Sequence, residues 1–166
     1  MDAKMKEFYD EYFKTKDVEL TSYQSDPVCM ALMFHKDKNG EPDYVLPTVN
    51  LGSSIGNGTI MPKYCAFLDT NNNPGIDEYL HEAKLAEPYT RFGSVVTAQS
   101  GWCEYPLYKF NEEVLKKVVP EKDIQTYEEG YNKAFKDIQR QMNMDMFGFD
   151  PFAEGSENDN FDDDYE

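Results

Sequence analysis

The chain has 166 residues, enough for one domain with a real hydrophobic core. It carries 32 Asp and Glu against 16 Lys and Arg, and this net charge of −16 excludes a conventional nucleic-acid-binding face, which needs cations to neutralise phosphates. The same charge disfavours binding to an anionic membrane, and the longest apolar run, residues 28–34, is far shorter than the roughly 20 residues that span a bilayer.

An amphipathic helix is predicted first, followed by two paired strands. The helix is expected over residues 2–14, where apolar residues recur at helical spacing, namely Met5, Phe8, Tyr9, Tyr12 and Phe13. The uninterrupted apolar run 28–34 predicts a strand covered on both faces. Asn39-Gly40 is typical of a hairpin turn and leads into an expected partner strand over residues 43–51. Pro47 cannot donate a ladder hydrogen bond, so we expect this second strand at a sheet edge or at a bulge.

The middle of the chain is predicted to form a loop, a third strand and a helix. Residues 52–58 are rich in Gly and Ser and are expected to be a flexible loop, and residues 64–68 are the expected third strand. Asn73 is predicted to cap the following helix, with Pro74 in its first turn and the Glu87-Pro88 dipeptide at its end. The expected apolar face of this helix consists of Ile76, Tyr79, Leu80 and Ala83.

Two further strands and two helices complete the expected fold. The strands are predicted over residues 89–98 and 102–110, around a turn at Ser100-Gly101. Asn111 is expected to cap a short helix, and a longer helix is expected over residues 120–142. The apolar stripe of that longer helix consists of Ile124, Tyr127, Tyr131, Phe135, Ile138 and Met142. This order of elements predicts an α+β fold, with a small, mostly antiparallel sheet of about five strands packed with three to four helices.

Negative charge is concentrated at the C-terminus. Residues 145–166 contain nine acids and no base, which leaves a net charge of −7 on residues 1–144. We therefore expect residues 1–144 to form the single domain and residues 145–166 to be a disordered acidic tail. Acids interleaved with aromatic residues suit a segment that folds onto a basic partner. The predicted partner-binding residues are Asp145, Asp150, Glu154, Glu157, Asp159, Asp162, Asp163, Asp164, Glu166, Phe149, Phe152 and Phe161. A solubilising tail without a partner is the alternative.

Three features that could carry chemistry favour structural roles instead. The stretch 69–75 alternates acids and amides like a calcium loop, but it lacks Gly at the sixth position and Glu at the twelfth. Cys29, Cys65 and Cys103 are far apart in the sequence, so they are not expected to bind zinc together. We expect them to be reduced thiols in the core. The Gly-rich stretch 52–59 lacks the Lys of a phosphate-binding loop.

The most tempting nucleophile is Cys103, but a cysteine enzyme also needs a base, and His35 and His81 are the only histidines. We instead expect Gly101 to permit a turn, Trp102 to pack in the interior and Cys103 to be a small buried side chain. No catalytic residue, metal ligand or cofactor is predicted.

Four short motifs indicate a relationship to a known family. They are Leu46–Leu51 (LPTVNL), Phe67–Asn72 (FLDTNN), Leu85–Pro88 (LAEP) and Ser100–Tyr108 (SGWCEYPLY). In this order and spacing they resemble the domain-of-unknown-function family numbered 4313, over roughly residues 28–115. The resemblance implies a cytoplasmic accessory protein of the kind carried on mobile elements of Gram-positive bacteria. It implies no reaction.

These observations lead to one functional expectation and one alternative. The expected function is a non-enzymatic acidic protein that mimics nucleic acid and inhibits a basic, nucleic-acid-binding host defence protein, of anti-restriction or anti-CRISPR type. Its partner would be a protein, such as a nuclease, with no direct contact to nucleic acid or membrane. The alternative is an accessory or regulatory module that binds a protein through an apolar sheet or helix face, without mimicry.

Overall fold

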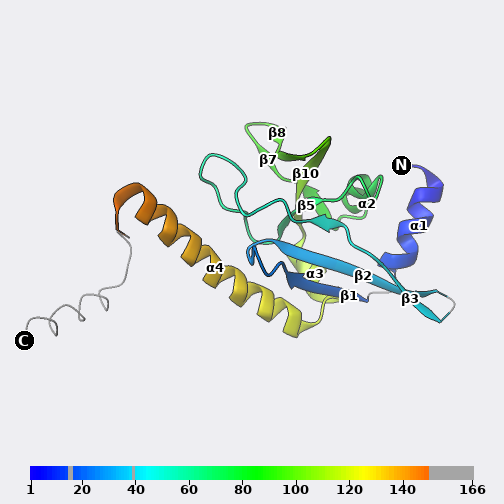
Figure 1. Cartoon of the computed structure of the whole chain (residues 1–166). Coiled ribbons are helices and arrows are strands. Elements are labelled where there is room, and N and C mark those ends of the chain that lie inside the picture. Colours follow the sequence, from blue (N-terminus) through cyan, green and yellow to red (C-terminus); the bar gives the residue numbers. More distant parts are fainter. Residues whose placement is uncertain (15–16, 39, 150–166) are drawn as a thin grey trace, which may run out of the picture.

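The computed structural model describes residues 1–14, 17–38 and 40–149, and within them the chain forms four helices and ten strands. All strand pairs are antiparallel, and they build a three-stranded sheet, a five-stranded sheet and a separate two-stranded hairpin. The α+β class and the antiparallel pairing are therefore confirmed. Figure 1 shows the first and last helices at opposite ends of the molecule, with the last helix running away from the sheets.

The first sheet has the order β1-β2-β3, and α1 packs beside it. The elements are α1 (Ala3–Phe13), β1 (Val18–Ser22), β2 (Met30–Lys38) and β3 (Glu41–Val45). The expected first helix and the expected hairpin between β2 and β3 are confirmed. β1 was not predicted, because Val18 and Leu20 are its only large apolar residues. The phenyl rings of Phe13 and Phe34 lie 3.9 Å apart and join α1 to β2.

Only one face of β2 is fully buried. Met30, Leu32 and Phe34 are buried, whereas Ala31 and Met33 on the other face are partly exposed. The expectation that this strand is covered on both faces is therefore wrong. An apolar run predicts burial of every residue, but here the second face of the sheet is only partly covered.

The second sheet has the order β4-β5-β10-β6, and β9 also pairs with β10. The strands are β4 (Thr48–Val49), β5 (Cys65–Leu68), β6 (Ala86–Pro88), β9 (Thr97–Ser100) and β10 (Cys103–Phe110). The expected strand over residues 43–51 is split at Leu46-Pro47, so that β3 and β4 belong to different sheets. Each is an edge strand, which confirms the edge position that Pro47 predicts.

The residues expected to form one strand, 89–98, instead contain a small hairpin. Its strands are β7 (Thr90–Arg91) and β8 (Ser94–Val95), and β9 begins two residues later. Val96 N–H donates to the carbonyl of Tyr89 at 2.9 Å and closes the base of this hairpin. β6 and β9 thus run along the same edge of β10, and the β7–β8 hairpin protrudes between them.

Helix α2 (Ile76–Glu82) begins and ends differently from the prediction. Its N-cap is Gly75 in a left-handed conformation (φ +77°), without a side-chain cap. Asn73 is not the cap, because its side-chain amide donates to the carbonyls of Leu46 at 2.8 Å and Asp69 at 3.2 Å. The helix also ends before Glu87-Pro88, because residues 86–88 pair with β10 as strand β6.

The last two helices are α3 (Glu112–Val118) and α4 (Glu121–Phe147). Asn111 caps α3 as expected, since its side-chain oxygen accepts from the amides of Glu113 and Val114 at 3.1 and 3.3 Å. α4 is longer than expected and continues to Phe147. Among the described residues, no helix combines the length and the apolar character needed to cross a membrane.

Candidate functional site

The predicted partner-binding residues lie at the end of α4 and beyond it. Asp145 is in the last turn of α4, where it accepts a hydrogen bond from the Gln141 side chain at 3.0 Å, and Phe149 is exposed just after the helix. The other ten predicted partner-binding residues lie outside the described residues, namely Asp150, Phe152, Glu154, Glu157, Asp159, Phe161, Asp162, Asp163, Asp164 and Glu166.

The first half of α4 is fixed to the sheets by aromatic side chains. Ile124, Tyr127 and Tyr131 are buried. The Tyr127 hydroxyl accepts from the backbone N–H of Tyr64 at 2.9 Å, and the Tyr131 hydroxyl donates to the carbonyl of Met61 at 2.6 Å. Tyr64 in turn donates to Glu128 Oε1 at 2.5 Å. We call this cluster of Tyr64, Tyr127 and Tyr131 the tyrosine seam.

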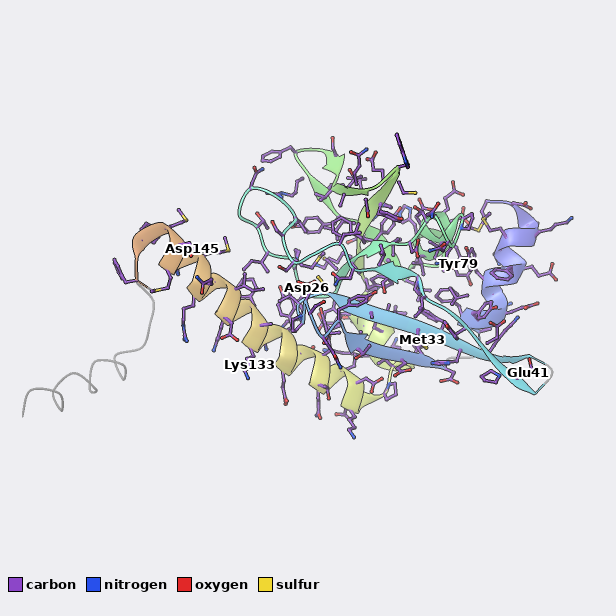
Figure 2. The ribbon with its side chains drawn as sticks, viewed as in Figure 1. Asp26, Met33, Glu41, Tyr79, Lys133 and Asp145 are labelled. Atoms are coloured by element: carbon purple, nitrogen blue, oxygen red, sulfur yellow. The ribbon has the colours of Figure 1, made fainter. Side chains whose placement is uncertain are left out.

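The second half of α4 runs away from the sheets (Figure 1). Ala134, Phe135 and Ile138 still pack partly buried against the core, so its apolar residues become exposed only near the end of the helix. Figure 2 shows Lys133 near the middle of the helix and Asp145 on its far part, away from the sheets. Within residues 144–149, four large apolar side chains are exposed, namely Met144, Met146, Phe147 and Phe149, and Met146 is 72% exposed. We call residues 133–149 the projecting arm. It places exposed apolar groups directly before the most acidic part of the sequence.

The folded part of the chain is less acidic than the whole. The 17 residues 150–166 contain eight acids and no base, so residues 1–149 hold 24 acids and 16 bases, a net charge of −8. Several of those acids form ion pairs, such as Asp10 with Lys6 at 2.9 Å and Glu112 with Lys116 at 2.8 Å. Half of the net charge of the chain is therefore carried by residues 150–166, directly after the projecting arm.

A cleft of about 780 Å³ lies where the end of α2 meets the start of α3 and strands β6 and β10. Its charged and titratable lining mixes bases with acids, namely Lys63, Lys84, Lys109, His81, Glu82, Glu87, Glu112 and Glu113. No sequence pattern predicts this cleft, because its lining comes from three separate segments, residues 63–64, 81–87 and 109–113.

Two cleft residues adopt the left-handed conformation without being glycine. Lys84 (φ +60°) follows the last turn of α2, where the amide of Leu85 donates to the carbonyl of Leu80 at 2.9 Å and so satisfies a carbonyl of the helix end. Tyr64 (φ +63°) belongs to the tyrosine seam. A hydrogen bond therefore holds each of these backbone turns: Leu85 N–H to the Leu80 carbonyl after Lys84, and Tyr64 N–H to the Tyr127 hydroxyl.

The three cysteines differ in how deeply their side chains are buried. Burial raises the pKa of Cys29 and of Cys65 to about 12, so both remain protonated thiols at neutral pH. Cys103 is only partly buried, so the expectation of a buried side chain is wrong for it. It lies on β10, whereas His35 lies on β2 and pairs with Glu19 at 3.3 Å, and His81 lies on α2.

The stretch 69–75 forms a turn held by its own side chains. The Asp69 carboxylate accepts from the amide and the side chain of Asn72 at 3.2 and 2.8 Å, and so holds a turn directly after β5, in agreement with the expected structural role of this stretch. No group of three or more His, Cys, Asp or Glu within the described ranges is placed to hold a metal ion.

Trp102 lies on the surface, not in the interior. It was expected in the interior, but it is 103% exposed at the tip of the β9–β10 hairpin. Phe92 is 96% exposed at the tip of the β7–β8 hairpin. A pattern of aromatic residues next to Gly predicts a turn correctly, but it does not show which way the side chain points. We call residues 88–103, which contain both tips, the hairpin region.

Comparison with known proteins gives one match. A family model described as Domain of unknown function (DUF4313) matches residues 17–131. This range contains both larger sheets, the hairpin region and the tyrosine seam, and it extends beyond the 28–115 expected from the four motifs. α1 and the whole projecting arm lie outside it. No curated protein and no solved structure matches the chain.

Proposed function

The chain belongs to the DUF4313 family, and we propose that it is a non-enzymatic acidic protein that competes with nucleic acid for a basic groove on a partner protein. The proposed partner is a nucleic-acid-binding defence protein, such as a restriction or CRISPR nuclease. The net charge of −16, half of which follows the projecting arm, is the observation that carries this proposal.

The physical basis is competition between carboxylates and phosphates. A groove that binds nucleic acid is lined by Lys and Arg, whose field attracts any polyanion and accelerates its association. Eight acids within 17 residues provide a negative charge density that such a groove would favour. The residues 150–166 that carry them are joined to the projecting arm, which extends beyond the sheets.

The projecting arm also offers apolar contacts. Charge attraction alone gives fast but weakly specific binding, whereas buried apolar side chains slow dissociation. Met144, Met146 and Phe147 are exposed in the last two turns of α4 and can supply these contacts. The proposed partner surface therefore combines a basic groove with an adjoining apolar patch.

The same exposed side chains favour a second candidate function. A protein-interaction module without mimicry would bind mainly through the apolar side chains of the arm, and its acids would only keep the protein soluble. The two functions differ in their dependence on salt, because ionic contacts between exposed groups are screened and apolar contacts are not.

The decisive experiment compares two variants of the full chain. A truncation after Phe149 removes eight acids and changes the net charge from −16 to −8, whereas the double variant Met146→Ser and Phe147→Ser keeps the charge. Partners are captured from a bacterial lysate at about 0.05 M NaCl and eluted at about 0.5 M NaCl. The purified partner is then tested for displacement of a labelled DNA duplex by each variant.

Under the proposed function, the truncation slows association, weakens its salt dependence and abolishes DNA displacement, while the apolar variant retains fast association. Binding that changes with neither salt nor truncation would contradict charge mimicry. Loss of binding in the apolar variant alone would support the interaction module.

A further inference from the structure

The hairpin region differs in charge from the rest of the protein. In the whole chain 29% of residues are charged, but residues 88–103 contain no acid and a single base, Arg91. Its remaining exposed residues are mainly Thr, Ser, Gln and Gly, together with Phe92 and Trp102. Few charges and exposed aromatic anchors within a neutral polar surround are typical of the centre of a protein–protein interface.

Turn geometry explains why both aromatic side chains point outward. Arg91 pairs with Ser94, so Phe92-Gly93 is a two-residue turn in which both residues have positive φ, +53° and +80°. This is the pattern of a type I′ turn, whose first position favours Asn over a bulky residue. In the second hairpin, Gly101 at φ +61° allows the turn that leaves Trp102 at the tip.

Phe92 therefore does not stabilise the fold. It buries almost no surface, being 96% exposed, and it holds a left-handed conformation that an aromatic residue rarely adopts. A side chain in a strained position without internal contacts points to a role outside the folded chain.

The hairpin region is also held in place before any partner binds. The Arg91 guanidinium donates to the carbonyl of Ile55 and to the hydroxyl of Thr59, both at 3.2 Å, and so ties the β7–β8 hairpin to the loop 52–60. At the base, Leu107 N–H donates to the carbonyl of Val96 at 2.8 Å. A tip that is fixed in advance loses little entropy on binding.

From these observations we propose that Phe92 and Trp102 anchor a protein-docking surface, and that each inserts into an uncharged apolar pocket of a partner protein. The absence of acids on the hairpin region matches an uncharged pocket, because no carboxylate must be desolvated there. A partner rich in phosphate fits less well, since Arg91 is the only cation of this region and its guanidinium already binds the loop. This surface is independent of the acidic residues that carry the proposed function.

The test places a photo-crosslinker in the full chain inside bacterial cells. Trp102→p-benzoylphenylalanine probes the hairpin tip, and Tyr44→p-benzoylphenylalanine, at an exposed aromatic position on β3, is the matched control. We expect one discrete protein adduct from position 102 and not from position 44. Adding Phe92→Asn should remove the adduct, and excess wild-type chain should compete it away, whereas excess chain carrying Phe92→Asn and Trp102→Ser should not.

The purified partner then gives the affinity. Trp102→Ser and Phe92→Asn should each weaken binding by about 30-fold, as expected for buried aromatic anchors. Trp102 is the only tryptophan, so its fluorescence reports directly on the tip and should shift to shorter wavelength when the partner binds. The truncation after Phe149 and a salt concentration of about 0.5 M should leave this contact unchanged, because it contains no ion pair.

Four results would overturn this inference. They are equal adducts from both positions, an adduct only between copies of the chain, the same fluorescence shift with phosphatidylcholine–phosphatidylglycerol vesicles, and the same shift with an oligothymidylate. Loss of DNA displacement in the truncated chain, with this adduct intact, would leave both proposals standing. An intact adduct with salt-independent DNA displacement would contradict only the charge mimicry.

Discussion

Aromatic side chains have opposite roles in the tyrosine seam and at the tips of the hairpin region. In the seam, Tyr64, Tyr127 and Tyr131 are buried, and each forms a hydrogen bond that fixes α4 to the sheet. At the tips, Phe92 and Trp102 contact mainly solvent. Aromatic content alone therefore does not distinguish core residues from surface residues. Substitutions in the seam should destabilise the fold, and substitutions at the tips should not.

The largest expected effect is in the seam. Tyr127→Ala should lower the free energy of unfolding by about 3–5 kcal/mol, because it leaves a large cavity beneath α4. Tyr127→Phe keeps the ring but leaves the amide of Tyr64 without its acceptor, so it should cost about 1–3 kcal/mol. Urea unfolding followed by circular dichroism measures both. Equal stability of Tyr127→Ala and the wild-type chain would show that α4 is not fixed by the seam.

Alkaline pH tests the seam and the packing of α1 without a mutation. Burial raises the pKa of Tyr9, Tyr12 and Tyr131 to about 12, and it also raises the pKa values of Tyr64 and Tyr127. An unfolded tyrosine loses its proton near pH ~10, so between about pH 10 and 12 the folded chain binds more protons than the unfolded chain. The contribution of these tyrosines should be complete below pH ~10 and fall by about 1 kcal/mol per pH unit for each of them above it. The buried thiols of Cys29 and Cys65, whose pKa values burial also raises, should begin the same loss near pH ~8.5.

Urea midpoints measured at several pH values, together with tyrosinate absorbance, check this expectation. Ionisation of all tyrosines near pH ~10 in the still-folded chain would contradict it.

At the hairpin tips, Phe92→Asn should stabilise the fold. Asn is favoured at the first position of a type I′ turn and tolerates the positive φ, so we expect a gain of about 0.5–1 kcal/mol. Ser94→Ala, next to the same turn, is a control for changes that do not alter φ. Thermal unfolding measures the gain, and a destabilised Phe92→Asn chain would mean that the phenyl ring packs within the fold.

The smallest expected effect is at Trp102. Because its side chain is exposed, Trp102→Ser should change stability by less than about 0.5 kcal/mol. A loss of about 3 kcal/mol or more, typical of a buried Trp, would show that Trp102 packs against the fold. Comparing this value with that of Tyr127→Ala directly measures the difference between tip and seam.

Much of the fold could be predicted from local patterns. The helical spacing of residues 2–14, the antiparallel pairing of β2 with β3 and the Asn111 cap are confirmed, because each depends on residues close in the sequence. β1 was missed because Val18 and Leu20 are its only large apolar residues, and β6 was missed because it is three residues long and is stabilised by pairing with β10, about 20 residues later in the chain. The family was also identified from four short motifs and is confirmed over residues 17–131.

The net charge and its concentration at the C-terminus can be read directly from the amino-acid sequence, because they follow from composition. Only the tertiary structure decided which aromatic residues are buried. Tyr127 and Trp102 are both large aromatic residues in regular patterns, yet one accepts a hydrogen bond beneath α4 and the other is fully exposed. The physical reason is that burial depends on which distant segments cover a side chain. β5 and β6 pair with β10 only from Leu107 onward, so nothing covers the tip at Trp102.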